Sequence, residues 1–292
     1  MQSETNAASL MSCPVCESVH RDGTFQAKGR LIVTCGSCRL QFVDPLTPAA
    51  EAALQKLGKV FMETYIREEP SYRAYFRRKT NDLLKVMPPG RLLDVGCATG
   101  VFLHEARRAG FQGTGLDLLP SAVEYARDRL GVDARLGLLH ETAFSSGQFD
   151  AVTLFQIIEH VPAPRDLVKE VGRVLRPGGV LLLTTPDRRG FLARVMGRRW
   201  FEYYNEEHLT YFEGTSLRRL LVDSGFTMGS LSTEFGRAFT LAYVAERLSD
   251  FYYTDRSVAS RGARLLARLL RAAGGVTLRE PWQSLYAMAR RT

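Results

Sequence analysis

The chain has 292 residues, of which 45% are apolar, and its formal net charge is +8. This length suits one doubly wound domain with additions at either end. No run of eighteen apolar residues occurs, and residues 1–5 lack the basic and apolar regions of a signal peptide, so a soluble, cytoplasmic protein is expected. The positive charge comes mainly from arginine; a nucleic-acid or anionic-membrane partner would fit it, but a solvated arginine-rich surface explains it more simply.

Four of the five cysteines form two C-x-x-C pairs, Cys13 with Cys16 and Cys35 with Cys38, separated by eighteen residues. Such paired knuckles place four thiolates around one tetrahedral ion, and this spacing is typical of structural zinc sites. Two disulfides are the alternative, which a reducing cytoplasm disfavours. Because four protein ligands leave no position open for a substrate, the predicted Zn²⁺ would hold the fold and take no part in chemistry.

The segment between the two pairs predicts a short hairpin over residues 25–34 that turns at Lys28 and Gly29. Residues 1–44 are therefore expected to form a zinc ribbon. Binding of a structural zinc can supply about 10–16 kcal/mol of apparent free energy, which is enough to fold about forty residues with almost no core. The fifth cysteine, Cys97, lies in a later glycine-rich turn and is interpreted as a small packing residue.

Residues 45–87 are expected to form a linker and a helical lid. Two prolines open this segment, and helical stretches are predicted at residues 49–61 and 65–86. The second stretch carries aromatic residues at helical spacing, Tyr72, Tyr75 and Phe76. Core packing is the first interpretation of this stripe, and a cover over a ligand site is the second.

An apolar strand at residues 91–95 runs into the turn Asp94-Val-Gly96-Cys97-Ala-Thr-Gly100, and Asp117 ends the next strand. Glycine has no Cβ, so backbone N–H groups in such a turn can approach a ligand closely. Asp117 is placed to accept two hydrogen bonds from a ribose diol. The pattern predicts a nucleoside site at the carboxyl edge of a parallel sheet; a tight turn with glycines for structural reasons alone is the alternative.

Further elements follow at the spacing of βα units. A helix is predicted over residues 120–130 with Gly131 at its end, and a third strand over residues 134–136. A fourth strand at residues 151–155 delivers Gln156 and the segment Ile-Ile-Glu159-His160-Val-Pro to the same edge. Residues 174–186 contain Leu-Arg-Pro-Gly-Gly and an apolar fifth strand.

Four motifs occur in this order: the turn at residues 94–100, Gly115-Leu-Asp117, the segment at residues 149–162, and the segment at residues 174–186. Together they resemble the class I S-adenosylmethionine-dependent methyltransferases over about residues 88–236 and 284–290. The resemblance implies an α/β, Rossmann-like fold with a doubly wound, seven-stranded, mainly parallel sheet. It also implies S-adenosyl-L-methionine as methyl donor. The residues matched to the donor site are Asp94, Gly96, Cys97, Gly100, Asp117, Leu118, Phe155 and Gln156.

The chemistry of the turn also favours this donor over a dinucleotide. The turn is not Gly-x-Gly-x-x-Gly, and the carboxylate of Asp94 would repel a pyrophosphate but suits the cationic methionyl end of S-adenosylmethionine. One position departs from the family, whose members commonly carry Asp or Glu beside Gly137 to bind the adenine amino group. Leu138 and Leu139 stand there instead, so a backbone carbonyl and apolar stacking are expected to recognise adenine.

Residues 201–212 resemble the Glu-His-Leu-x-x-Phe segment that borders the acceptor cavity in many small-molecule members of the family. This resemblance makes His208 the first candidate for general base and His160 the second. Imidazole titrates near neutrality and could take the proton of an acceptor hydroxyl, an effect typically worth about 10²–10⁴-fold. The alternative is structural, with either histidine capping a helix or satisfying a buried carbonyl.

Two arginine-rich segments leave alternatives open. Five arginines within residues 188–199 could grip the phosphate of a nucleotide-linked or lipid-linked sugar, or could lie in a solvated loop. Before the last strand, the methyltransferase domain at residues 88–292 carries a predicted helical insertion at about 237–283. Its amphipathic faces predict a cap over the acceptor, an interface with a second copy, or peripheral contact with an anionic membrane.

The sequence therefore predicts an enzyme that transfers a methyl group to a small-molecule or glycan acceptor, first a hydroxyl of a sugar or secondary metabolite. The order of ribbon, aromatic helix and core resembles bacterial glycan and secondary-metabolite methyltransferases. An RNA methyltransferase that binds substrate through the ribbon, a sugar C-methyltransferase and a non-catalytic donor-binding protein are the alternatives. The motif used to methylate nucleobase amino groups and the cysteine used for C5 methylation are both missing, which disfavours a nucleic-acid substrate.

Overall fold

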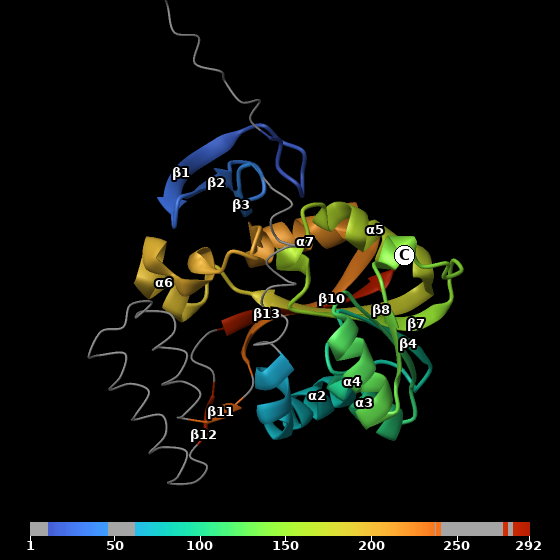
Figure 1. Cartoon of the computed structure of the whole chain (residues 1–292). Helices are drawn as coiled ribbons and strands as arrows, with labels where there is room; N and C mark the ends of the chain where they lie inside the picture. Colours follow the sequence, from blue (N-terminus) through green and yellow to red (C-terminus); the bar gives the residue numbers. More distant parts are fainter. Residues whose placement is uncertain (1–10, 46–61, 237, 241–276, 280–282) are drawn as a thin grey trace, which may run out of the picture.

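The computed structural model describes residues 11–45, 62–236, 238–240, 277–279 and 283–292 (Figure 1). Within these residues the chain forms an amino-terminal ribbon and an α/β core. The predicted helix at residues 49–61 and most of the predicted helical insertion lie outside the described residues. The part of the insertion that is described contains two short antiparallel strands, β11 (Ala238–Thr240) and β12 (Thr277–Arg279).

The ribbon is a four-stranded antiparallel sheet in the order β1-β2-β3-β9. Strands β1 (Arg21–Ala27), β2 (Arg30–Cys35) and β3 (Gln41–Val43) come from the amino-terminal segment, whereas β9 (Thr210–Tyr211) comes from the core. The hairpin turns at Lys28 and Gly29, whose φ angles of 48° and 74° match a two-residue turn with left-handed backbone. The predicted hairpin is confirmed, and its strands are longer than expected.

The core is a seven-stranded sheet in the order β10-β13-β8-β7-β4-β5-β6. Its strands are β4 (Arg91–Val95), β5 (Gln112–Asp117), β6 (Asp133–Leu136), β7 (Phe149–Phe155), β8 (Leu175–Pro186), β10 (Phe226–Phe235) and β13 (Gln283–Arg291). Only β13 runs antiparallel to its neighbours, β8 and β10. The predicted doubly wound, mainly parallel sheet is confirmed. Its central strands are continuous apolar runs, as strands covered on both faces require, and Leu181, Leu182 and Leu183 of β8 are all buried.

Helices cover both faces of this sheet in three layers (Figure 1). On one face lie α2 (Glu69–Leu84), α3 (Val101–Arg108) and α4 (Pro120–Leu130); on the other lie α5 (Pro164–Val174) and α7 (Gly214–Asp223). Helix α4 has the predicted bounds, and Gly131 ends it with a φ of 61°. The shorter helical pieces are α6 (Phe191–Met196), η1 (Leu139–Glu141), η2 (Ile158–His160), η3 (Gly197–Arg199) and η4 (Phe201–Tyr204).

The aromatic stripe of α2 packs into the core at Phe76. This ring is buried, and its centroid lies 5.5 Å from that of Phe102 on α3 and 5.1 Å from that of Phe155 at the end of β7. Tyr72 and Tyr75 are partly buried beside it. At Phe76 the stripe therefore packs in the core, and at Tyr75 it borders the end of β7, where the ring centroids of Tyr75 and Phe155 lie 6.5 Å apart.

The ribbon is anchored on the core segment that contains His208. Strand β3 pairs with β9, and the side chains of Ile32 and Val43 form a buried cluster with Trp200 and Tyr203. The guanidinium of Arg30 adds four hydrogen bonds to backbone carbonyls; the acceptors are Tyr203 and Asn205 at 2.7 Å each, His208 at 3.0 Å and Glu206 at 3.1 Å. The boundaries expected at residues 44 and 87 stay a prediction.

Among the described residues, no helix is both long enough and apolar enough to cross a membrane. The order of the sheet instead directs attention to one edge. Strand β4 is flanked by β5 on one side and β7 on the other, so the chain reverses its direction of winding there. In open α/β sheets, ligands bind outside the carboxyl ends of the strands at this reversal.

Candidate functional site

The glycine-rich turn lies at the carboxyl end of β4 and has an unusual backbone. Gly96, Ala98 and Gly100 have φ angles of 78°, 46° and 78°, in the left-handed region that favours glycine. The N–H groups of Gly96 and Cys97 both donate to the carbonyl of Leu116, at 2.8 and 2.9 Å. A Cβ at Gly96 would overlap the side chain of Ile157, so only glycine fits at this position.

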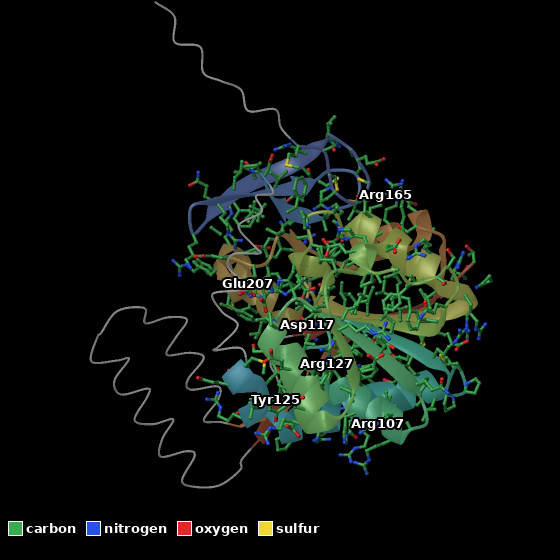
Figure 2. The ribbon with its side chains drawn as sticks, turned by 45° about the vertical axis from the view of Figure 1, so that its right-hand side comes forward. Arg107, Asp117, Tyr125, Arg127, Arg165 and Glu207 are labelled. Atoms are coloured by element: carbon green, nitrogen blue, oxygen red, sulfur yellow. The ribbon has the colours of Figure 1, made fainter. Side chains whose placement is uncertain are left out.

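Asp117, at the end of β5, is tied to this turn. Its Oδ2 accepts the N–H of Ala98 at 2.7 Å, and its Oδ1 accepts the N–H of Leu119 at 2.9 Å. Burial raises the pKa of Asp117, and these backbone hydrogen bonds oppose the rise. Figure 2 labels this side chain. Because a carboxylate oxygen can accept more than one hydrogen bond, both oxygens of Asp117 keep capacity for the two hydroxyls of a ribose.

Asp94 is the second carboxyl group of the turn, and it is almost completely buried. Its Oδ1 accepts a hydrogen bond from the hydroxyl of Thr153 on β7 at 2.6 Å. Burial raises the pKa of Asp94 to about 7; the Thr153 bond opposes this rise, and the charge of Asp117 adds to it. The carboxyl group therefore changes its charge near neutral pH. Close by in the same turn, the hydroxyl of Thr99 is buried and has no hydrogen-bond partner among the described residues.

On the other side of β4, strand β7 ends in a residue with strained backbone. Gln156 has a φ of 58°, which is uncommon for a residue with a side chain and often marks a functional position. Its N–H donates to the carbonyl of Thr184 at 2.9 Å. Its side-chain amide reaches the hydroxyl of Thr184 at 3.1 Å and that of Ser284 at 3.4 Å. Three strand ends of the sheet are thus joined at this residue.

Directly after Gln156 the structure brings both predicted histidines together with a glutamate. Glu159 and His208 are buried, and the ring centroids of His160 and His208 lie 4.7 Å apart. The hydroxyl of Thr185 on β8 donates to Oε2 of Glu159 at 2.9 Å. Nδ1 of His160 lies 3.1 Å from the carbonyl oxygen of Glu207, a residue labelled in Figure 2.

The charges of this cluster move its pKa values in opposite directions. Burial, and to a lesser extent the charge of His208, together lower the pKa of His160 to about 3. Burial also lowers the pKa of His208, but the carboxylates of Glu202 and Glu159 outweigh it, so the net pKa is raised. Nδ1 of His208 lies 3.1 Å from Oε2 of Glu202. Burial raises the pKa of Glu159 to about 7, against the charge of His208. His208 is therefore the imidazole that carries positive charge more readily.

Comparison with known proteins agrees with this arrangement. The family described as "Methyltransferase domain" matches residues 66–231, which is more than half of the chain. The chain belongs to this methyltransferase domain family. The resemblance to class I S-adenosylmethionine-dependent methyltransferases is thereby confirmed.

Individual curated relatives match a smaller part of the chain than the family does. The chain is 36% identical over 122 residues to a ubiquinone biosynthesis O-methyltransferase of Xanthomonas campestris, covering 39% of this chain and 51% of the relative. It thus spans about half the length of the curated relatives it matches. Two solved structures share the fold. A possible histamine N-methyltransferase of Thermotoga maritima has a TM-score of 0.53 and 16% identity, covering 82% of this chain and 98% of that one. An S-adenosylmethionine-dependent methyltransferase of Archaeoglobus fulgidus has a TM-score of 0.52 and 16% identity, with coverages of 78% and 99%.

In this methyltransferase domain, the residues predicted for the donor gather at the carboxyl ends of three adjacent strands, β5, β4 and β7. Two of them have a structural role. The thiol of Cys97 is buried against Gly115, as the packing interpretation expected, so only its backbone is available to a ligand. A Cβ at Gly100 would meet Ala126 and Val132 at 2.9 and 2.7 Å, so glycine there permits close packing of α3 and α4.

Three residues around the histidines were not singled out from the sequence. Glu159 stands next to His160, so the pair Glu-His was the available signal. Thr185 and Glu202 gave no signal, because they reach Glu159 and His208 only through the pairing of β8 with β7 and the turn at η4. Their roles depend on tertiary structure.

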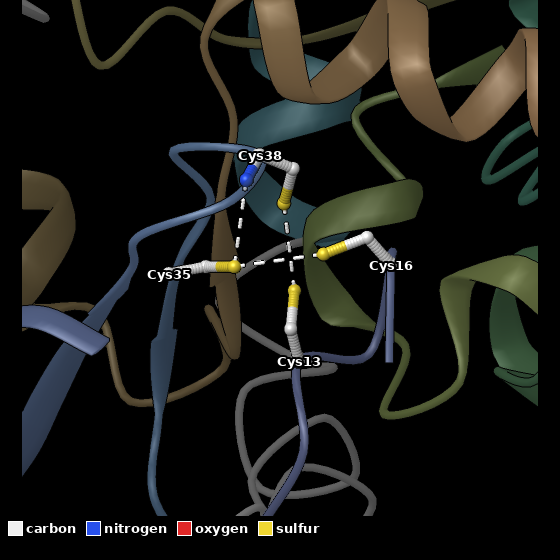
Figure 3. Close-up of side chains that lie close together, drawn as sticks. All are labelled: Cys13, Cys16, Cys35 and Cys38. Atoms are coloured by element: carbon white, nitrogen blue, oxygen red, sulfur yellow. Dashed lines mark hydrogen bonds between the residues drawn. The ribbon is translucent and has the colours of Figure 1, made fainter. Parts of the chain in front are cut away.

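The four cysteines of the ribbon meet as predicted, and Figure 3 shows their thiols pointing toward one another from two knuckles. The Sγ atoms of Cys13 and Cys38 lie 3.5 Å apart, as do those of Cys16 and Cys35. A disulfide would need about 2.0 Å, so both bridges are excluded. Four sulfurs at about 2.3 Å from a tetrahedral Zn²⁺ are about 3.8 Å apart, and the cluster fits this requirement.

The arginine-rich segment is divided between two environments. Arg188 is partly buried, forms an ion pair with Glu213 and donates to the carbonyl of Arg39 at 3.0 Å, so it joins ribbon and core. Arg198 lies over the ring of Phe25 with 5.6 Å between its Cζ and the ring centroid. Arg194 and Arg199 are exposed. The phosphate hypothesis therefore applies to the exposed members and not to Arg188.

Proposed function

We propose that this chain transfers the methyl group of S-adenosyl-L-methionine to a hydroxyl of a small molecule, first of all a sugar or secondary metabolite. The observation that carries the proposal is the position of the two groups of residues. Asp94 and Asp117 lie at the carboxyl ends of β4 and β5, and Glu159, which lies beside His208, follows β7 at the same edge of the sheet. The O-methyltransferase name of the Xanthomonas relatives supports an oxygen acceptor.

The donor side is assigned to the residues that the sequence predicted. Asp117 would bind the ribose hydroxyls, and Asp94 would favour the cationic methionyl end. Gly96, Cys97 and Leu118 would contribute backbone groups, while Phe155 and Gln156 border the place where the methyl group must lie. The donor supplies an electrophilic methyl group, so the protein gains chiefly by orienting the acceptor, an effect that can be worth about 7–11 kcal/mol.

On the acceptor side, the cluster of Glu159, His160 and His208 would activate the hydroxyl. The sequence predicts His208 as general base and His160 as second choice, and this remains one way in which the cluster could act. Its burial and its contact with Glu202 hold the His208 ring in one orientation, as a base requires. In either mode of action, losing His208 should affect the reaction more than donor binding.

The ribbon is proposed to hold one structural Zn²⁺ through Cys13, Cys16, Cys35 and Cys38. Their convergence supports this assignment, together with their unbridged state. A ribbon at residues 1–44, a linker and lid at 45–87, and a methyltransferase domain at 88–292 remain the proposed division. Contact with a membrane surface or a second copy through the insertion at about 237–283 also stays a prediction.

The test is transfer of labelled methyl from S-adenosylmethionine into extract of the source organism lacking this gene. The extract is separated into small-molecule, glycolipid and RNA fractions. Label is expected in the small-molecule or glycolipid fraction and should be lost with His208→Ala, while donor affinity, measured by calorimetry, stays unchanged. His140→Ala, a change at an exposed histidine, is the matched control and should retain turnover.

Label in RNA would overturn the small-molecule assignment and make the ribbon a substrate-binding module. Donor binding without label in any fraction would favour a non-catalytic protein. Loss of donor affinity in His208→Ala would give that histidine a structural role.

A further inference from the structure

We infer that Glu159, His160 and His208 form a second metal site, separate from the four cysteines, for a divalent ion of the zinc type. Each of the three side chains offers one ligand atom, and these atoms all lie within 4.8 Å of one another. Small side-chain rotations bring such atoms to the distances of about 2.0–2.2 Å that Zn²⁺ keeps from imidazole nitrogen and carboxylate oxygen. The role of this ion in the reaction rests on the proposed function, but its binding does not.

Two of the proposed ligands, Glu159 and His160, have a hydrogen-bond partner at their other polar atom, and His208 has the carboxylate of Glu202 as an ion-pair partner there. Oε2 of Glu159 accepts the hydroxyl of Thr185, Nδ1 of His160 lies 3.1 Å from the carbonyl oxygen of Glu207, and Nδ1 of His208 lies 3.1 Å from the carboxylate of Glu202. Oε1 of Glu159 and Nε2 of each histidine then remain for an ion. Metal-binding histidines typically donate their second ring N–H to a carbonyl or carboxylate in this way.

An independent observation comes from Oε1 of Glu159. The residue is only 1% exposed, and this oxygen has no hydrogen-bond partner among the described residues. A buried carboxylate oxygen without a partner is unfavourable unless a donor or a cation satisfies it. An ion between Glu159 and the two histidines would remove this cost.

The ligand set also indicates the kind of ion. Two imidazoles and one carboxylate suit Zn²⁺ and its neighbours, whereas Mg²⁺ and Ca²⁺ prefer oxygen ligands alone. The four cysteines close their site, but three protein ligands leave at least one position open, which is typical of catalytic zinc. The four-cysteine site would thus stabilise the fold, and the site of Glu159, His160 and His208 would take part in the reaction.

In the proposed reaction, the open position would take the acceptor oxygen. A divalent ion lowers the pKa of a bound hydroxyl strongly, so the proton can leave to solvent at neutral pH. The oxygen then forms its bond to the methyl carbon as the carbon–sulfur bond of the donor breaks and sulfur keeps the electron pair. His208 would act as a ligand in this scheme, and the ion would replace it in activating the hydroxyl.

The experiment is a titration of Co²⁺ into the purified full chain with zinc retained in the ribbon, followed by absorption spectroscopy and native mass spectrometry. One further ion per chain should bind with weak d–d bands and no thiolate-to-cobalt charge transfer, since its ligands are nitrogen and oxygen. Glu159→Gln and His208→Ala should weaken this binding by at least about a hundredfold, and Thr185→Val by about 10–100-fold. Glu206→Gln and His140→Ala, changes at exposed residues, should leave it unchanged.

Absence of a further bound ion in the wild-type chain would overturn the inference, as would undiminished binding in a folded Glu159→Gln variant. The wild-type titration does not depend on whether any variant folds. Methyl transfer that persists at full rate after chelation has removed this ion, as checked by native mass spectrometry, would refute its role in the reaction and leave the proposed function standing. Ion binding with no methyl transfer to any fraction would support the metal site and refute the proposed function.

Discussion

Asp94 combines two properties that rarely occur together in a carboxyl group. It is buried between strands, where the charged form is disfavoured, and it belongs to the turn proposed to bind a cationic ligand. With its pKa at about 7, the group is largely neutral at pH 6 and largely ionised at pH 8. Only the ionised form attracts a positive charge, so the raised pKa of Asp94 should make donor binding depend on pH.

We therefore expect the affinity for S-adenosylmethionine to increase as the pH rises through about 7. If the ionised form alone binds, the apparent Kd should fall by about tenfold between pH 6 and pH 8. Asp94→Asn should bind more weakly and with a flatter profile, because it keeps the shape and removes the charge. Calorimetric titrations at several pH values measure both, and an unaltered profile in Asp94→Asn would assign the titration to another group.

At this scale the sequence was informative where a residue acts through its own neighbourhood. The positions of Asp94 and Gly96 could be predicted because a strand and the turn after it lie within a few residues, and that of Asp117 because it ends the next strand. Their role in donor binding stays a prediction. Glu202 and Thr185 could not be predicted, since each contributes one oxygen to a histidine or carboxylate that only folding brings near. Glu159 lies between these cases: its position was visible, but its unpartnered oxygen was not.

The turn before α3 shows how one glycine can satisfy two demands of an element. Gly100 precedes the helix with a φ of 78°, and a Cβ there would press on Ala126 and Val132 of the neighbouring α4 region. Gly29, in the ribbon hairpin, has a similar φ of 74°, but a Cβ added there would meet nothing within 4 Å. Comparing the two glycines therefore separates the effect of left-handed backbone from the effect of close packing.

Gly100→Ala is expected to lower the free energy of unfolding by about 2–4 kcal/mol, from left-handed backbone and overpacking together. Gly29→Ala, the control, should lower the free energy of unfolding by about 1–2 kcal/mol, because it introduces left-handed backbone strain without a steric clash. Urea unfolding followed by circular dichroism compares them. Equal losses would show that the contact between α3 and α4 adjusts without cost.

Elements were predictable in proportion to the length of their pattern. Helix α4 and the ribbon hairpin have a periodic body and a glycine at the point where the chain turns, and both occur where the sequence placed them. Strand β9 has two residues, Thr210 and Tyr211, and no periodicity can reveal it. It forms by pairing with β3, which lies near the amino-terminal end of the described residues.

Across the whole molecule, the ribbon contacts the core segment that contains His208, which is proposed to face the acceptor. Arg30 holds the carbonyls of Tyr203, Asn205, Glu206 and His208, so one ribbon side chain fixes the backbone that carries a predicted catalytic histidine. The fold class could be predicted from the order of motifs. This junction could not, because it depends on how two separately recognisable parts meet.

Arg30→Met should therefore lower kcat by about tenfold or more while leaving donor affinity unchanged, since displacement of a reacting group by about 1 Å can cost up to a hundredfold. Lys28→Met is the matched control: its ion pair with Glu206 is exposed and should contribute little. Single-turnover kinetics and donor calorimetry provide the two readouts. A parallel loss of donor affinity in Arg30→Met would mean that the ribbon supports the entire core.

The pairing of β3 with β9 also delays completion of the ribbon sheet while the chain is being synthesised. Phe42 of β3 and its partner Thr210 of β9 are 168 residues apart (210 − 42), so at about 5–20 residues per second the ribosome needs roughly 8 to 34 s to supply the missing strand. During that time the ribbon has an unpaired edge, which is a site for association with other chains. Early capture of zinc by the nascent ribbon would keep this edge short and ordered, so the yield of folded protein should depend on the metal supply while the chain is still being made.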